Sequence, residues 1–588
     1  MPCPASGRLA SRRLTVVSVA LPAAAVGIAA LALYLSQPHR GLFENGPELM
    51  EMWRRGIVIH GHALLLPLAR MAAALGLAGS PAVPDRAVSL VSGVGAALAV
   101  FVVTARAASW SGLRAALAAG ALLALAPVLR FYAGAVETRA LGCGFASVAG
   151  ALAAWAAPTR ARALAAVTAG YALACAAHAS LVVLGPPLLL LHADAELRAG
   201  RRLSIARLSA AGALLVASAV ATAGVLYLAD QALNPRLANV TSWTVFYLDV
   251  SRGWGAMVGR PHPLAWTMTE VLGPANALLP LALIGIAPLM RRAPWRCVAL
   301  VLWTTTLVSA SYGVGSRQLG GYFLAALPAL GWLAADGLRH LLTLPTRSAA
   351  LGAAGLALVA LLAVPAGLDA WQTGGGDRAF GDRAHRPWVV QRGDLALPWP
   401  APVGAWLAPI HPLLWLLGGA LAALAAGRVG GTAPPSKSSA PRAAPALAVV
   451  GVALALQVAG GEAFRERWPI HWSQATRDYC EAARATLGPR DRLFTAVPHP
   501  GVAWEFNYYL GDRWTNVGME ALLAPAQRAD WLAGVEAELE HVRAEGGQAY
   551  LGQDGLLLLE LRRDRSPQAL AAARRWLDEG RVTLWSPR

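Results

Sequence analysis

Three carboxylates gather just after the first long apolar run of the chain. Glu44, Glu48 and Glu51 lie three and four residues apart in the stretch "FENGPELMEMWRR". In a helix, residues at this spacing share one face. A carboxylate in such a group could act as a general base that takes a proton from an attacking hydroxyl, with its neighbours raising its pKa. The alternative is a solvated acidic helix turn that pairs with Arg54 and Arg55.

A further acid, Glu137, stands in the short gap between two apolar runs, in "FYAGAVETRALGCGFASV". A carboxylate beside a bilayer is costly unless it is solvated, paired or used. One interpretation places Glu137 near the first-loop acids at the membrane surface. The other is a local ion pair with Arg139 at the lipid headgroups. Spacing alone leaves both open.

His60 and His62 add acid–base groups to the first loop. Two histidines without a third ligand at a fixed spacing indicate a metal site only weakly, and a place on a helix surface is the alternative. The five cysteines are scattered and show no metal-ligand spacing. The sequence therefore indicates no cofactor and no metal site, although a divalent cation is compatible with it.

Arginines near the ends of apolar runs could bind a phosphate through bidentate hydrogen bonds. Arg236 and Arg317 fall in gaps between such runs, and Arg317 has the shortest tether. Tyr322 follows Arg317 within the next run. These side chains are candidates for holding a lipid-borne phosphate.

The elements that must position these groups are membrane spans. Of 588 residues, 56% are hydrophobic and 14% are charged, whereas globular domains carry about 25% charged residues. Apolar runs long enough to approach the thickness of a bilayer recur along the chain and predict a mainly α-helical, polytopic bundle of about thirteen spans. The expected spans are 14–36, 86–105, 113–131, 139–157, 163–177, 179–192, 208–229, 270–289, 297–313, 320–337, 348–366, 404–426 and 444–460.

The arginines predict the orientation of this bundle. The net charge is +17, but the arginines lie mostly in alternate short gaps instead of one patch, as membrane topology requires and nucleic-acid binding does not. With the N-terminus in the cytoplasm, the first loop 37–85, the gap around Glu137 and the tail 461–588 all fall on the extracytoplasmic side. Within the first loop, residues 62–79 predict a helix that lies along the membrane surface.

The tail changes in composition and predicts a small extracytoplasmic α/β domain. Helices are expected at 477–488, 526–546 and 566–580, and strands at 491–497, 548–552 and 555–562. The aromatic segment 497–514 is expected to be a loop, and its His499 and Trp504 could bind a sugar or peptide acceptor beyond a strand end. The alternative is an aromatic packing edge.

Together these features resemble the GT-C membrane glycosyltransferases, and more narrowly the bacterial relatives of protein O-mannosyltransferases. "ENGPEL" places Glu48 on the glutamate of the first motif of that family, and His60 follows at the corresponding interval. "VETRALG" places Glu137 on the acid of the second motif. Asn45 replaces the family's leading aspartate unless Glu44 substitutes for it, and Arg139 replaces a tyrosine. The resemblance implies a GT-C-like transmembrane domain over 1–460 and an extracytoplasmic domain over 461–588, in a bacterial inner membrane.

The resemblance also implies an activity. An inverting glycosyltransferase of the hexosyltransferase type would move a sugar from a polyprenyl-phosphate donor to a protein, lipid or glycan acceptor of the cell envelope. We expect Glu48 to be the base and Glu137 the orienting acid, while His60, Arg139, Arg236, Arg317 and Tyr322 contact the donor. A lipid-substrate transporter or flippase is the alternative, but it predicts acids within the spans. A non-catalytic GT-C-like assembly protein is also open because of Asn45.

Overall fold

The chain forms two compact units. The computed structural model describes residues 6–36, 42, 46–59, 63–78, 84–234, 275–314, 323–343, 450–458 without 452 and 456, 470–497 and 500–586. The first unit, called the helical unit, comprises Met1–Pro38, Gly56–Trp371 and Trp399–Arg465. The second, called the C-terminal unit, comprises His39–Arg55, Gln372–Pro398 and Glu466–Arg588. A short stretch of the first loop thus belongs to the C-terminal unit.

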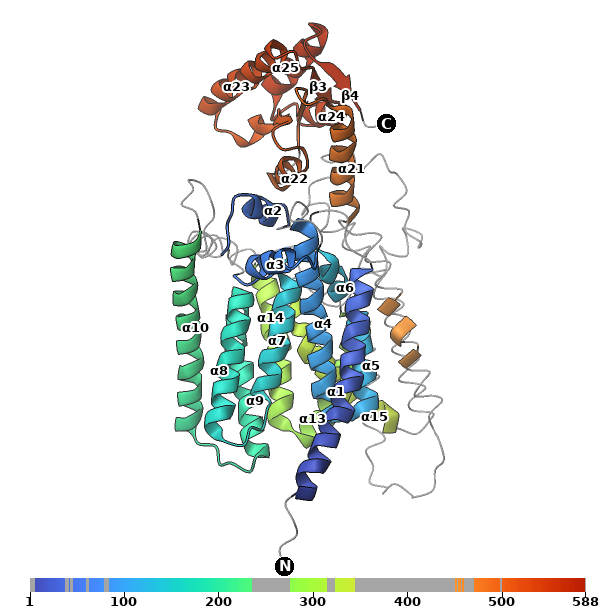
Figure 1. Cartoon of the computed structure of the whole chain (residues 1–588), viewed down its shortest axis with the longest axis vertical. Coiled ribbons are helices and arrows are strands. Elements are labelled where there is room, and N and C mark those ends of the chain that lie inside the picture. Colours follow the sequence, from blue (N-terminus) through green and yellow to red (C-terminus); the bar gives the residue numbers. More distant parts are fainter. Residues whose placement is uncertain are drawn as a thin grey trace, which may run out of the picture. The chain divides into compact units, whose positions relative to one another are not determined.

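The helical unit is a bundle of apolar helices (Figure 1). Its described helices are α1 (Ser6–Leu35), α3 (Leu65–Ala74), α4 (Pro84–Ser111), α5 (Leu113–Ala124), α6 (Pro127–Gly134), α7 (Arg139–Ala153), α8 (Arg160–Ala177), η1 (Ala179–Leu184), α9 (Gly185–Arg198), α10 (Ile205–Leu233), α13 (Leu278–Arg292), α14 (Pro294–Val314), η2 (Leu324–Ala326) and α15 (Leu327–Thr343).

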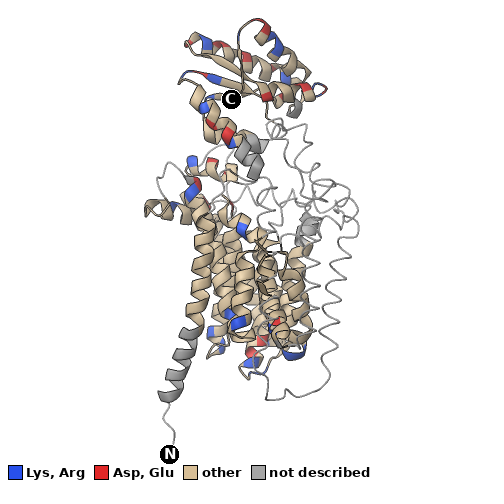
Figure 2. Cartoon of the chain, turned by 90° about the vertical axis from the view of Figure 1, so that its right-hand side faces the viewer, with Lys and Arg blue, Asp and Glu red and all other residues tan. Residues whose placement is uncertain are grey.

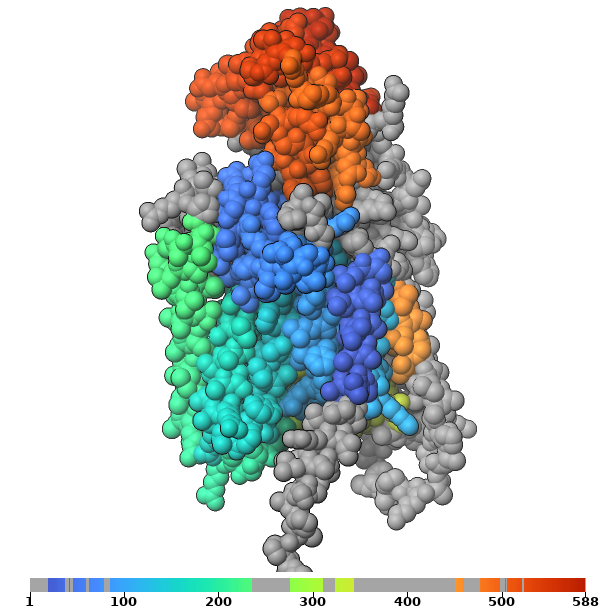
Figure 3. All heavy atoms as spheres, viewed as in Figure 1, coloured from blue at the N-terminus to red at the C-terminus, as the bar shows by residue number. Residues whose placement is uncertain are grey.

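These helices make the protein an integral membrane protein. Among the described residues, three helical stretches are long and apolar enough to cross a bilayer: Asp85–Ser111, Ala179–Arg198 and Ile205–Leu233. Charged side chains are sparse along the bundle and gather near helix ends (Figure 2). Helix α10 lies at the flank of the bundle (Figure 3), and only 11% of an apolar 18-residue stretch of it is buried. The predicted spans 348–366 and 404–426 lie outside the described residues, so the total of thirteen stays a prediction.

One predicted span is not a single straight helix. Residues 113–131 were expected to form one span, but α5 and α6 meet at an angle of 57°. Pro127 begins α6 and has no N–H to continue the ladder of α5. Ala126, which precedes it, takes an extended conformation with φ −58° and ψ 127°. The bend therefore follows from a proline inside an apolar run.

Helices α4 and α7 approach each other backbone to backbone. A Cβ added to Gly95 would lie 2.5 Å from Leu141 Cα, and one added to Gly144 would lie 2.5 Å from the Gly95 carbonyl oxygen. Small residues permit this spacing in membrane bundles, where van der Waals packing drives helix association because lipid provides no hydrophobic effect between helices. The start of α7, and the residues just before it, are thereby fixed against α4.

The first loop contains a short helix of the kind predicted for 62–79. Helix α3 lies crosswise to the long helices of the bundle (Figure 1) and packs against α4. It buries Leu65 and Leu66 while Met71 is 55% exposed. An apolar side chain exposed beside a membrane bundle fits a helix that rests along the bilayer surface.

The C-terminal unit is built on a parallel sheet of four strands in the order β2-β1-β3-β4. Its described elements are α2 (Gly46–Arg54), α21 (Ile470–Thr486), β1 (Arg492–Thr495), α22 (Pro500–Leu510), β2 (Trp514–Asn516), η5 (Met519–Leu522), α23 (Pro525–Ala544), β3 (Ala549–Gly552), α24 (Gln553–Leu561), α25 (Pro567–Asp578) and β4 (Thr583–Trp585).

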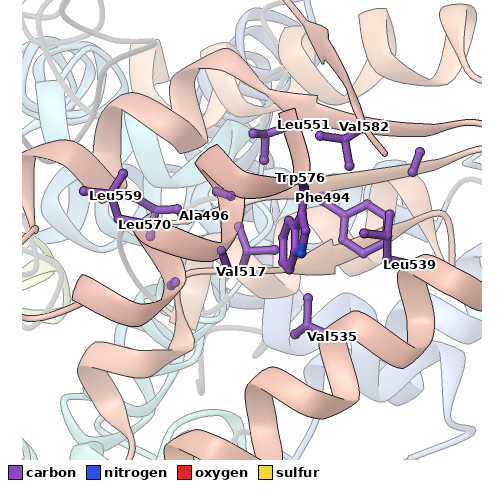
Figure 4. Close-up of a cluster of buried hydrophobic side chains, with 14 of the residues drawn as sticks. Phe494, Ala496, Val517, Val535, Leu539, Leu551, Leu559, Leu570, Trp576 and Val582 are labelled. Atoms are coloured by element: carbon purple, nitrogen blue, oxygen red, sulfur yellow. The ribbon is translucent and has the colours of Figure 1, made fainter. Parts of the chain in front are cut away.

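Both faces of the sheet are covered by apolar side chains. Phe494 packs with Trp576 and Leu551 on one face (Figure 4). The preceding residue, Leu493, packs with Phe506 on the other face. Successive strand residues point to opposite faces, so each strand contributes to two cores, as in parallel sheets buried on both sides.

Two predictions for the tail are wrong in element type. The expected loop 497–514 contains α22, and the expected strand 555–562 lies in α24. Four consecutive leucines in α24 suit either a buried strand or a buried helix, so the sequence pattern could not decide. The structure places α24 directly after β3, where Leu558 and Leu559 enter the core. The short strands β2 and β4 were not predicted.

Replacing Gly95 with valine tests the approach of α4 to α7. The branched side chain would meet backbone atoms that cannot rotate away, so the free energy of unfolding should fall by about 3 kcal/mol. Thermal unfolding in detergent measures the change. Gly224→Val in α10 is the matched control because nothing lies within 4 Å of a Cβ there. Equal effects of the two substitutions would contradict the close approach.

Asp554 predicts a pH dependence of the C-terminal unit. Burial raises the pKa of this carboxyl above its ordinary value of 3.8. The protonated form is favoured in the fold, so its stabilisation is present below the ordinary pKa and is lost as pH rises through the folded pKa. We expect Asp554→Asn to flatten this part of the profile of unfolding temperature against pH in the whole chain. Asp530→Asn, at an exposed position on α23, should leave the profile as it is, and a profile unchanged by Asp554→Asn would refute the assignment.

Candidate functional site

A buried stretch at the start of α7 carries three charged side chains. Every residue from 126 to 144 is buried, and this stretch includes Arg130, Glu137 and Arg139, which are 9%, 0% and 5% exposed. Charged side chains at such depth in a membrane bundle are expensive and usually serve a function. The segment between α6 and α7 is therefore the first part of the candidate site.

Two neighbours hold Glu137 in place. The Ser92 hydroxyl of α4 donates to the Glu137 carbonyl oxygen at 2.6 Å. The carboxylate Oε1 accepts hydrogen bonds from the Thr138 amide and the Thr138 hydroxyl, both at 2.9 Å. Hydrogen bonds to a carboxylate fix its orientation. Glu137 is thus a fully buried carboxylate with a defined direction.

Arg139 lies against an aromatic ring instead of extending to solvent. Its Nη1 donates to the Tyr132 hydroxyl at 3.1 Å, and its Cζ lies 5.4 Å from the centre of that ring. A guanidinium that stacks on tyrosine keeps its planar fork in one orientation. Tyr132 therefore positions Arg139.

His178 joins the same region from the end of α8. Its Nδ1 lies 2.7 Å from the Ser180 hydroxyl. A Cβ added to Gly142 of α7, one turn after Arg139, would lie 3.0 Å from His178 Cβ. The imidazole is thus packed onto the first turns of α7.

Tyr132 and His178 therefore contact the first turns of α7, which directly follow Glu137, and Arg130 lies in the same buried stretch of the chain. A buried guanidinium can bind an anion through charge-assisted hydrogen bonds. Arg130, Tyr132 and His178 were not among the site residues predicted from the sequence. A charged residue inside the apolar run 113–131 was a signal for Arg130, because charges within spans mark functional sites.

The second part of the candidate site is α2 in the C-terminal unit. Glu48 is half-buried in its first turn. Glu51 accepts hydrogen bonds from Arg54 Nε at 3.0 Å and Arg55 Nε at 2.6 Å. Burial alone would raise the pKa of Glu51, but these arginines outweigh it and lower the pKa. Glu51 thus follows the ion-pair interpretation, and the role of Glu48 as a base stays a prediction.

Helix α2 packs against α22 within the C-terminal unit. Leu49 and Met50 of α2 are 1% and 0% exposed. Helix α22 contains Trp504, an expected acceptor residue, and Glu505, which is 1% exposed. Burial, and then the charge of Glu505, raises the pKa of the Cys480 thiol, which places Glu505 against α21. The motif glutamate and the aromatic segment of the tail thus lie on neighbouring helices.

Several predicted site residues lie outside the described residues: Glu44, His60, Arg236, Arg317, Tyr322 and His499. They stay predictions. Within the described ranges, no group of three or more His, Cys, Asp or Glu side chains could hold a metal ion.

A separate ion-pair network lies at the other end of α7. Arg198 donates to the carbonyl oxygen of Ala154, the residue after α7, at 2.9 Å. Asp194 accepts from Arg198 Nε at 2.9 Å and from Arg296 at 3.1 Å. Arg296 also stacks on Trp110, with its Cζ 4.2 Å from the ring centre. Asp194 is paired with an arginine of its own helix and with one from α14, so we assign the network a structural role.

Removing the Tyr132 hydroxyl tests its hydrogen bond with Arg139. In Tyr132→Phe the buried guanidinium loses an acceptor, so the free energy of unfolding should fall by about 1–2 kcal/mol. Thermal unfolding in detergent measures this, with Tyr227→Phe as the control because Tyr227 on α10 is 44% exposed. Equal unfolding temperatures for the two variants would show that the hydrogen bond between Tyr132 and Arg139 does not stabilise the fold.

No protein-family model matches this chain, and no curated protein matches its sequence. Its structure is similar to that of ArnT from Cupriavidus metallidurans. The crystal structure of the apo state has 19% identity over 87% of this chain and 86% of that chain, with a TM-score of 0.46. The crystal structure bound to undecaprenyl phosphate has 18% identity over 91% of this chain and 89% of that chain, with a TM-score of 0.51. At this identity the second likeness shows that the two chains share a fold, and it shows nothing more.

Proposed function

We propose that the protein is a membrane glycosyltransferase that moves a sugar from a polyprenyl-phosphate donor to an acceptor at the extracytoplasmic face. The observation that carries this proposal is the buried stretch 126–144, which contains Arg130, Glu137 and Arg139, in a fold shared with ArnT. The ArnT structure of that fold binds undecaprenyl phosphate, and a phosphate is an anion that buried arginines suit.

The arginines take the role of binding the donor phosphate. A guanidinium fork matches two phosphate oxygens, and its charge stabilises the phosphate as it leaves the sugar. Arg139, already oriented by Tyr132, needs little reorganisation to act in this way. Arg130 supplies the second cation. Glu137, held by Thr138, limits the net charge and orients the arginines or the sugar.

Glu48 takes the role of the general base. The acceptor hydroxyl gives its proton to this carboxylate while its oxygen forms a bond to the anomeric carbon. The bond from that carbon to the phosphate oxygen breaks, and polyprenyl phosphate leaves with the electron pair. Attack opposite the leaving group gives inversion at the anomeric carbon. The packing of α2 on α22 would bring the base close to an acceptor bound by aromatic residues such as Trp504.

The finer assignment is a relative of the protein O-mannosyltransferases. It rests on the match of Glu48, His60 and Glu137 to the two motifs of that family. A hexose donor and a hydroxyl acceptor on protein, lipid or glycan follow from this assignment. His60, Arg236, Arg317 and Tyr322 would complete the donor contacts.

Transfer from labelled polyprenyl-phosphate sugars to envelope acceptors tests the proposal. Glu48→Gln and Glu137→Gln keep the shape of each side chain but remove its charge. Loss of a general base or of an electrostatic partner should lower kcat by about a hundredfold or more. Glu51→Gln on the same helix as Glu48 is the matched control, because its ion pairs with Arg54 and Arg55 are of a surface kind that contributes little.

The outcomes separate the alternatives. Consumption of donor by the wild-type protein, with loss in both variants and retention in Glu51→Gln, supports the transferase. Retained turnover in Glu48→Gln refutes that residue as the base. Movement of the lipid across vesicles without cleavage of the sugar–phosphate bond would replace the transferase with a flippase.

A further inference from the structure

Asn234, the residue after α10, binds the backbone of the first loop. Its Oδ1 accepts the Val58 amide at 2.7 Å and the Ile59 amide at 3.0 Å. Its Nδ2 donates to the Ile59 carbonyl oxygen at 2.5 Å. One side-chain amide thus satisfies three backbone groups that are about 175 positions away in the chain.

A buried acid fixes the orientation of this amide. Asp230, one turn earlier on α10 and 2% exposed, accepts a hydrogen bond from Asn234 Nδ2. The carboxylate can accept only from the amide nitrogen, so Asn234 must direct its oxygen toward the two amides of the loop. Asp230 therefore decides which way Asn234 faces.

The three hydrogen bonds from Asn234 to residues 58 and 59 are called the clamp, and they hold a segment without regular secondary structure. Residues 57–59 belong to neither helix nor strand, although Ile57 and Ile59 are buried. Buried backbone groups outside helices and sheets need side-chain partners. Arg70 of α3 supplies one by donating to the Ile57 carbonyl oxygen at 3.1 Å, and Asn234 supplies the others.

The clamp lies where the chain enters the helical unit. Helix α2 ends at Arg54, and Gly56 has a φ of 77°, a left-handed conformation that ends helices and turns the chain. The boundary between the two units falls at this glycine. The path of residues 57–59 therefore sets where the connection from α2, which carries Glu48, is anchored.

We propose that Asn234 is a positioning residue for the transfer reaction. Asp230 orients its side-chain amide, and Asn234 anchors the connection between α2 and α3 to the end of α10. This role rests on the proposed glycosyltransferase function. Asn234 touches no reacting atom in this scheme. It acts by holding the segment that follows the helix of the proposed base.

Hydrogen exchange and kinetics of the whole protein in detergent test this role together. In Asn234→Ala, exchange of peptides that cover residues 57–59 should rise on the order of tenfold, since the Val58 and Ile59 amides lose their acceptor. The kcat of transfer should fall about tenfold, while KM for the donor stays within about threefold, because the phosphate contacts of Arg130 and Arg139 are retained. Gln231→Ala, at an exposed position on the same helix, is the matched control.

A charge exchange provides a second test. Asn234→Asp keeps the acceptor for the two loop amides but removes the donor and places a like charge beside Asp230. Adding Asp230→Asn restores a donor and removes the repulsion. The double variant should recover slower exchange at residues 57–59 and a higher kcat than Asn234→Asp alone.

Each result decides the proposal. Unchanged exchange at residues 57–59 in Asn234→Ala would show that there is no clamp. Faster exchange with unchanged kcat would remove its role in positioning. If wild-type protein turns over no polyprenyl-phosphate sugar, the proposed function fails, and positioning for transfer fails with it. The exchange data and the rescue by Asp230→Asn still decide whether the clamp itself exists.

Discussion

The close approach of α4 and α7 is the constraint on which the buried site depends. At Gly95 and Gly144 the two backbones leave no room for a side chain, so α7 cannot slide or rotate against α4 without a clash. Ser92 lies one turn before Gly95 and reaches the Glu137 carbonyl oxygen. The position of Glu137 is therefore set by helix packing, and its carboxylate is oriented by Thr138. Charged groups inside membrane proteins face the interior of the bundle and bind to neighbouring polar groups in this way.

The two ends of α7 carry different electrostatic arrangements. Helix α7 has 15 residues, so Glu137 and the Asp194 network are about 22 Å apart along its axis. At the Asp194 end, the carboxylate forms salt bridges with Arg198 of its own helix and with Arg296 of α14. At the Glu137 end, the carboxylate accepts hydrogen bonds from Thr138, and Arg139 stacks on Tyr132. The first arrangement joins two helices by ion pairs, and the second orients each charged side chain through a neutral neighbour.

The sequence predicted the helical bundle and the short gap around Glu137 because long apolar runs have few alternatives to helices in a bilayer. The bend at Pro127 was within reach of the sequence, because a proline inside an apolar run signals a break, but hydropathy alone does not register a missing N–H. The strand expected at 555–562 was a wrong prediction for α24, because four consecutive leucines fit both the strand period and the helix period. The partnership of Arg139 with Tyr132 was within reach, as they lie seven residues apart. The contact of Asn234 with Ile59 was not, because no local pattern links positions so far apart in the chain.

The assignment of α2 to the C-terminal unit changes how the first-loop motif should be understood. The motif places Glu48 and His60 in one loop, but the boundary between units passes between them, at Gly56. Residues 57–59, which follow this boundary, are held within the helical unit by three hydrogen bonds from Asn234. Their buried backbone groups lie outside helices and sheets, so a side chain must satisfy them. The polar end of α10 therefore fixes the path of the chain directly after the boundary that separates the two motif residues.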